Sequence, residues 1–175
     1  MKKTLLLTVL LSFSFYGFSQ DVKYGVRGGY TISHIDFDGT PTMENKHRNS
    51  VYIGFLANIS LSKTLSLMPE LQFSAEGAKT EALNLDYIQL PILLKFRVSE
   101  KIHAGLGPQI GIKVHKYEDG LKNLAYSAVV GVEYRINYAI FADVRYNYGI
   151  RNIFDDNLGI TAKNRNIQLG VGYKF

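Results

Sequence analysis

The sequence predicts an all-β protein, an eight-stranded antiparallel up-and-down transmembrane β-barrel. Three observations predict it. Apolar and polar residues alternate through eight segments, short and long connections take turns between them, and each apolar face holds about five or six residues. Alternation is typical of a strand with two different faces. A tilted strand needs roughly 9–11 residues to cross a bilayer, which matches five or six alternate apolar positions.

The eight segments, in chain order, are residues 22–33, 50–61, 65–76, 87–98, 102–114, 125–136, 138–149 and 166–175. In the first segment valine, tyrosine and isoleucine take the even positions, and lysine, arginine and glycine take the odd ones. The second and third segments have their apolar residues at odd positions, and the third places serine, glutamate and glutamine between them. In the fourth segment the even positions are apolar, opposite glutamine, lysine and arginine.

The last four segments continue the pattern. The fifth, sixth and seventh have apolar residues at even positions, and the eighth has them at odd positions. Glycine and glutamine fill the other face of the fifth segment. Glutamate, aspartate and arginine fill that face in the sixth and seventh, and glutamine, glycine and lysine fill it in the eighth. Valine, isoleucine, tyrosine and phenylalanine favour strands, so composition and periodicity agree.

The connections separate the two ends of the predicted barrel. Residues 62–64, residues 99–101 and a turn around Asn137 are short, whereas residues 34–49, 77–84, 115–123 and 150–165 form longer, polar connections. Outer-membrane barrels have short periplasmic turns and longer outer loops. Tyrosines near the strand ends predict aromatic girdles at the two membrane surfaces: Tyr24, Tyr30, Tyr126, Tyr134, Tyr138, Tyr146, Tyr148 and Tyr173.

The polar face is predicted to point inward. A soluble periplasmic barrel that binds a small apolar ligand also alternates, but with its apolar face inside. Here the polar face is rich in glycine and in charges of both signs, which suits the narrow interior of eight strands. The predicted interior charges are Lys23, Arg27, Glu70, Glu76, Lys95, Arg97, Lys113, Glu133, Arg135, Asp143, Arg145 and Lys174. We expect them to be paired, because an unpaired buried charge costs several kcal/mol.

The N-terminus predicts secretion. Residues 1–19 have the order of a signal peptide: two lysines, then a long apolar run, then small residues before the expected cleavage site. Cleavage there would leave a barrel domain over residues 20–175. The chain has no cysteine, which excludes disulfides, zinc–thiolate sites and a lipoprotein anchor. The net charge of +5 includes Lys2 and Lys3. The basic residues are scattered, so no nucleic-acid partner is expected.

Three prolines fall within predicted strands: Pro69, Pro91 and Pro108. Proline lacks the N–H that a ladder hydrogen bond needs. The expectation for Pro91 is a position at a bulge or near a rim, where the missing donor matters less.

No motif predicts catalysis, a cofactor or a metal site. A serine, a histidine and an acid would have to converge for an outer-membrane hydrolase, and Ser33, His34 and Asp36 are merely near one another in the sequence. Six loop residues carry oxygen ligands that could hold calcium, but their spacing matches no calcium loop: Asp36, Asp38, Glu44, Asp155, Asp156 and Asn157. An outer-membrane enzyme therefore stays the third hypothesis, after the soluble barrel, and we expect no enzymatic activity.

The chain resembles the small outer-membrane barrels of the Bacteroidetes, the PorT-like or porin-family group. The stretches that carry the likeness are YGVRGGYTIS (24–33), YIQLPILLKF (87–96), GLGPQIGI (105–112) and QLGVGYKF (168–175). The resemblance implies an eight-stranded barrel in outer-membrane lipid with a structural or interaction role. It also implies that Tyr173 and Phe175 form a C-terminal signal for the barrel assembly machinery. Other envelope proteins are expected as partners through loops 34–49 and 150–165.

Overall fold

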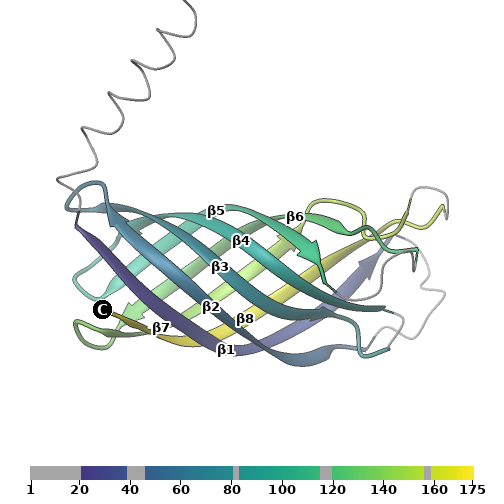
Figure 1. The fold of residues 1–175 in the computed structure, drawn as a ribbon, viewed down its shortest axis with the longest axis horizontal. Coiled ribbons are helices and arrows are strands. Elements are labelled where there is room, and N and C mark those ends of the chain that lie inside the picture. Colours follow the sequence, from purple (N-terminus) through teal and green to yellow (C-terminus); the bar gives the residue numbers. More distant parts are fainter. Residues whose placement is uncertain (1–20, 39–45, 81–82, 115–119, 156–158) are drawn as a thin grey trace, which may run out of the picture.

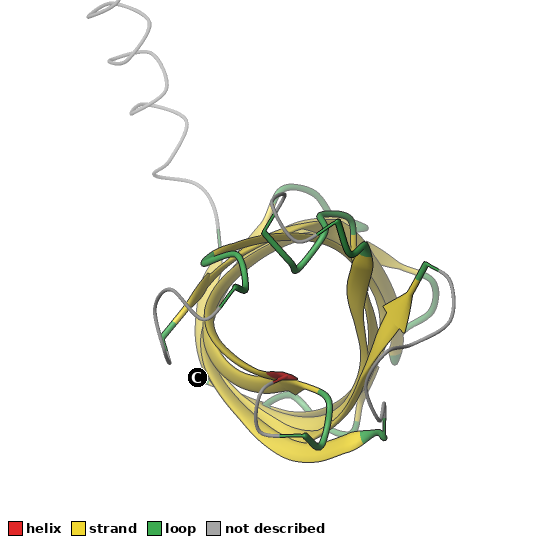
Figure 2. Ribbon diagram, turned by 90° about the vertical axis from the view of Figure 1, so that its right-hand side faces the viewer, coloured by secondary structure: helices red, strands yellow, loops and turns green. Residues whose placement is uncertain are grey.

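The computed structural model describes residues 21–38, 46–80, 83–114, 120–155 and 159–175, and the predicted signal peptide lies outside them. Eight antiparallel strands form a closed barrel in sequence order (Figures 1 and 2). The strands are β1 (Val22–Phe37), β2 (Arg48–Ser60), β3 (Leu65–Gly77), β4 (Asn84–Arg97), β5 (Ile102–Lys113), β6 (Leu124–Arg135), β7 (Ile140–Gly149) and β8 (Ala162–Lys174). The predicted fold class is confirmed.

Each strand pairs with its sequence neighbours, and β1 pairs with β8 to close the barrel. The short connections lie at one end, where the C-terminus also lies (Figure 1). The Phe175 N–H donates to the Tyr24 carbonyl there, and the Ser60 N–H donates to the Asp21 carbonyl. We call this end the turn end and the opposite one the loop end. Closure leaves no open sheet edge facing lipid.

The two faces lie as the alternation predicts in all eight strands. Val51, Leu106 and Val130 are more than half exposed on the outer surface. Their inward neighbours Tyr52 and Val129 are buried. Apolar side chains outside and polar ones inside are the arrangement of a membrane barrel, and they exclude a lumen built for an apolar ligand. Among the described residues, no helix is long and apolar enough to span a membrane.

Several strands run further toward the loop end than the alternation predicts. β1 continues to Phe37 and β8 begins at Ala162, so the two pair over four more residues. Charged side chains replace apolar ones on the outer face of this extension, where Asp36 forms an ion pair with Arg165. The extension therefore lies beyond the apolar belt, and its charges break the pattern that defined the strand ends.

The proline expectation is wrong. The pairing of β3 with β4 and of β4 with β5 keeps one register along its whole length, so Pro91 sits at no bulge, and it lies well inside β4. The β2–β3, β3–β4 and β4–β5 ladders instead lack paired residues at Pro69, Pro91 and Pro108, respectively. Each proline lacks one N–H, and the sheet loses pairing locally without changing register.

Gly77 ends β3 because its backbone has a φ of 92°, a conformation that L side chains rarely adopt. A Cβ at this position would lie 2.1 Å from the Leu83 carbonyl oxygen. The sequence therefore needs glycine where the chain turns between β3 and β4.

Candidate functional site

A ring of four charged side chains from three strands, β1, β3 and β7, fills part of the lumen. The Arg27 guanidinium donates to Glu70 Oε1 at 3.0 Å and to Asp143 Oδ1 at 2.9 Å. Arg145 lies 2.8 Å from Glu70 Oε2 through Nη1 and 3.1 Å from Asp143 Oδ2 through Nε. The four side chains are at most 4% exposed. Two cations alternate with two carboxylates, so the ring is formally neutral, which a buried charge cluster requires.

Tyr52 completes the surroundings of Arg27. Arg27 Nη2 lies 2.6 Å from the Tyr52 hydroxyl, and the guanidinium carbon lies 4.3 Å from the Tyr52 ring centroid. Gly170 makes room for this contact, because a Cβ there would lie 1.7 Å from the Tyr52 hydroxyl oxygen. Gly172 likewise makes room for the Phe141 ring, so the inward glycines of β8 accommodate large side chains from other strands, which explains glycine on this face.

Amide side chains extend the ring toward the loop end. Arg27 donates to Gln72 Oε1, Gln72 Nε2 donates to Gln89 Oε1, and Gln89 Nε2 donates to Glu76 Oε1. Asn164 Nδ2 donates to the other Glu76 oxygen at 2.6 Å. Both carboxylate oxygens of Glu76 thus accept hydrogen bonds from side-chain amides, and among the described residues the structure shows no ion pair to Glu76. A connected and buried polar network of this kind rigidifies a core.

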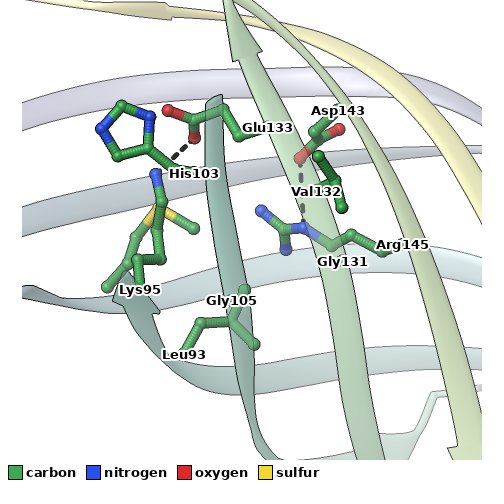
Figure 3. Close-up of a pocket in the computed structure, with 10 residues that line it drawn as sticks. Leu93, Lys95, His103, Gly105, Gly131, Val132, Glu133, Asp143 and Arg145 are labelled. Atoms are coloured by element: carbon green, nitrogen blue, oxygen red, sulfur yellow. Dashed lines mark hydrogen bonds and ion pairs between the residues drawn. The ribbon is translucent and has the colours of Figure 1, made fainter. Parts of the chain in front are cut away.

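A second charged group lies toward the turn end. The Glu133 carboxylate accepts hydrogen bonds from Lys95 Nζ and, at 2.6 Å, from Lys174 Nζ. His103 lies beside this pair, and Figure 3 shows Lys95, His103 and Glu133 together, with Asp143 and Arg145 on the neighbouring strand. Lys174 Nζ also lies 4.3 Å from the ring centroid of Phe141. Two lysines on one carboxylate leave this group with an excess positive charge.

The lumen between the two charged groups is nearly full. The cavity in Figure 3 has a volume of about 10 Å³, room for roughly one water molecule. Met68 and Leu93 close it together with the charged residues. Eight strands enclose only enough space for side chains. Within the described residues, the interior therefore forms a filled plug and not a water-filled channel.

The structure separates the predicted interior charges into buried and rim positions. Those buried inside the barrel are Arg27, Glu70, Glu76, Lys95, Lys113, Glu133, Asp143 and Arg145. Arg135 and Lys174 are partly exposed. Lys23 and Arg97 face inward by parity but are exposed, because both stand at the turn end of their strands, β1 and β4.

The rings of Tyr173 and Phe175, the predicted C-terminal signal, lie on the outer face with their centroids 6.4 Å apart.

Three further residues of the charged ring's network were not among the predicted site residues: Tyr52, Gln72 and Gln168. All three are buried and accept hydrogen bonds from Arg27. Their parity alone was a usable signal, because each occupies an inward position on a strand whose opposite face is apolar.

The candidate catalytic residues do not come together. The Ser33 hydroxyl points into the barrel and donates to the Gly77 carbonyl at 2.8 Å. His34 lies on the opposite face of β1, where its ring centroid is 5.2 Å from that of His47. Among the described residues, no three metal-ligating side chains cluster. Of the candidate calcium ligands, Glu44, Asp156 and Asn157 lie outside the described residues.

Comparisons with known proteins agree with this geometry. A family model described as "Outer membrane protein beta-barrel domain" matches residues 5–175. The attachment invasion locus protein Ail of Yersinia pestis is 17% identical with a TM-score of 0.53, over 89% of this chain and 99% of that chain. Neisserial surface protein A is 12% identical with a TM-score of 0.60, over the same shares. At such identities the likeness is one of fold. The comparison with curated proteins gives no match.

Proposed function

The chain belongs to the outer membrane protein beta-barrel domain family, and from this premise we propose that it acts through its loop end as an interaction surface on a closed barrel. The protein is an integral outer-membrane barrel. Its role is structural or interactive and not catalytic. The observation that carries the proposal is the filled lumen, which leaves the ends of the barrel as the places where a partner can bind.

The loop end is organised by its own apolar core. Leu121, Ile153 and Phe154 from the connections pack against Ile35 and Leu85 from the strands, and all are buried. Backbone hydrogen bonds join the β5–β6 connection to the β7–β8 connection. The Lys122 N–H donates to the Ile153 carbonyl, and the Asp155 N–H donates to the Gly120 carbonyl. A surface held in place before binding loses less conformational entropy when a partner docks.

Charged and aromatic side chains surround this core on the outer face. Arg165 pairs with Asp36 and lies 4.8 Å from the Tyr148 ring centroid. Arg151 lies 5.8 Å from the Tyr126 ring centroid. Arginine and tyrosine are enriched where proteins bind one another. We propose that other envelope proteins bind here, through the connections 34–49 and 150–165.

Photo-crosslinking in intact cells tests this proposal. A photoreactive residue in place of exposed Lys46 or Thr161 should give discrete protein adducts in the outer-membrane fraction. The same residue at Lys63, exposed at the turn end, is the matched control and should not give those adducts. Adducts that are identical from both ends, or absent from the loop end, would contradict an interaction surface at the loops.

We further propose that the protein is one of the PorT-like barrels of the Bacteroidetes. The support is the likeness of residues 24–33, 87–96, 105–112 and 168–175. None of these stretches carries a known activity over to this chain.

Secretion and assembly complete the proposal. A signal peptide over residues 1–19 should leave Gln20 at the N-terminus of the mature protein, which intact mass measurement checks.

Tyr173 and Phe175 stand on the lipid-facing side of the last strand, as a C-terminal signal for the assembly machinery requires. Replacing Phe175 by Ala should slow assembly in cells while leaving refolding of the purified chain unchanged. Equal effects in both assays would refute a recognition role.

A further inference from the structure

The turn end of the lumen opens into a basic cavity, which we call the vestibule. It has a volume of about 230 Å³ and is lined by residues of seven strands, all but β7, and of the turns between strands. One carboxylate, that of Asp21, lines it. The cationic side chains that line it are Lys23, Lys63, Lys95, Arg97, Arg135 and Lys174. A concave site with one sign of charge concentrates its field and attracts counter-ions.

The carboxylates nearby do not neutralise these cations. Glu133 already accepts from both Lys95 and Lys174. The structure shows no ion pair for Lys23, Lys63 or Arg97 among the described residues. The contrast with the neutral ring around Arg27 is chemical: there every cation has a carboxylate, whereas here cations exceed carboxylates. An oxyanion would supply the missing negative charge.

His103 adds a donor without an acceptor. Arg135 Nη2 lies 3.3 Å from His103 Nε2, and arginine can only donate, so Nε2 accepts. The proton of the neutral ring is then on Nδ1. That atom is buried and has no hydrogen-bond partner among the described residues, and the His103 side chain lines both the vestibule and the small cavity of Figure 3. An unpaired buried donor costs free energy, so hydrogen-bonding capacity is left unused beside the vestibule.

The vestibule ends blindly inside the barrel. On the side of the vestibule that faces the barrel interior, the lumen is closed by Met68, Leu93 and the Lys95–Glu133 pair. Only the cavity of about 10 Å³ in Figure 3 remains there. A ligand can therefore enter from the turn end alone, which faces the periplasm in an outer-membrane barrel. The guanidinium groups of Arg97 and Arg135 can bind phosphate oxygens in a bidentate way, and the lysines act as point charges.

We propose that the vestibule binds a small anion carrying phosphate groups from the periplasmic side. This site lies at the opposite end from the proposed interaction surface and does not depend on it. Phosphate fits better than a single carboxylate, because several cations surround one cavity and a phosphate offers more acceptor oxygens to them.

Calorimetry on the full-length mature barrel, in detergent free of phospholipid, tests the proposal with tripolyphosphate and with inorganic phosphate. We expect one tripolyphosphate per barrel, weaker binding of inorganic phosphate, and loss of affinity as ionic strength rises. Lys23→Gln with Lys63→Gln should weaken tripolyphosphate binding at least about tenfold. The matched control, Lys79→Gln with Lys163→Gln at the loop end, removes the same charge and should leave binding unchanged.

Two results would overturn the proposal: no binding to the wild-type barrel, or equal weakening by both double variants. A heat-dependent gel shift establishes that each variant is folded before the titration. A second arm repeats the titration in nanodiscs with and without phosphatidylglycerol. Loss of tripolyphosphate binding only with the anionic lipid would support the phosphate site and identify a lipid headgroup as its source. Unchanged binding would support a free periplasmic phosphate ligand.

Discussion

Replacing Arg27 by Met is expected to destabilise the barrel strongly. The guanidinium lies between Glu70 and Asp143, both of which are at most 3% exposed. The substitution changes the ring from neutral to a net charge of minus one and leaves two carboxylates to share Arg145. Removing one partner from a buried ion pair costs about 3–5 kcal/mol. At about 1.4 kcal/mol per factor of ten, the unfolding equilibrium constant should rise by between about a hundred and a few thousand.

A second substitution tests whether charge is the cause. Asp143→Asn restores neutrality beside Arg27→Met, because Arg145 then pairs with Glu70 alone. The double variant should therefore be more stable than the sum of the two single effects predicts, by about 1–3 kcal/mol. Arg97→Gln, at the exposed turn end, is the control and should change stability by no more than about 0.5 kcal/mol.

The assay is reversible urea unfolding of the purified protein in phospholipid vesicles. The folded fraction is measured as the gel band that shifts on heating, since the chain has no tryptophan to report by fluorescence. If the free energy of unfolding of the Arg27→Met variant is within about 1 kcal/mol of the wild-type value, the charged ring does not stabilise the interior as the structure implies. Strict additivity of the two substitutions would equally refute the electrostatic reasoning.

Three further substitutions probe other parts of the molecule. Val130→Arg places a charge on the outer face and should cost about 2–4 kcal/mol if the residue lies near the bilayer midplane, measured by the same urea assay; an effect below about 0.5 kcal/mol would place that face in water. Gly170→Ala should displace the Tyr52 hydroxyl from Arg27 and cost about 1–3 kcal/mol, and a neutral result would show that Tyr52 moves freely. Phe154→Ala should loosen the loop end and speed its cleavage by added protease, while the heat-dependent gel shift remains; unchanged cleavage would contradict an organised loop end.

The sequence was sufficient to predict the fold, since the physics of a membrane barrel repeats at every second residue. Alternation assigned the inward and outward faces in all eight strands, and the two classes of connection identified the two ends. Strand ends were harder to predict. Where β1 and β8 rise above the apolar belt, Asp36 and Lys163 lie on the outer face, and a pattern based on apolar residues stops there although the pairing continues.

The interior was predictable in composition but not in its pairings. Arg27 and Asp143 are 116 residues apart in the chain, and no local pattern indicates that they meet. Lys23 and Arg97 have inward parity, yet parity does not show how close a residue lies to the rim. The Pro91 expectation was wrong because proline was assumed to need a bulge, whereas the sheet gives up local pairing and keeps its register.

The central claim is that the apolar outer face contacts lipid while the charged side chains face the barrel interior. Because the chain has no cysteine, single cysteines at Leu106, Val130 and Val144, on three adjacent strands, can carry nitroxide labels in reconstituted vesicles. The structure predicts that all three labels collide with dissolved oxygen and not with a water-soluble nickel chelate. Ready access of the nickel chelate to these positions would show that the face is in water, and would contradict the membrane barrel described above.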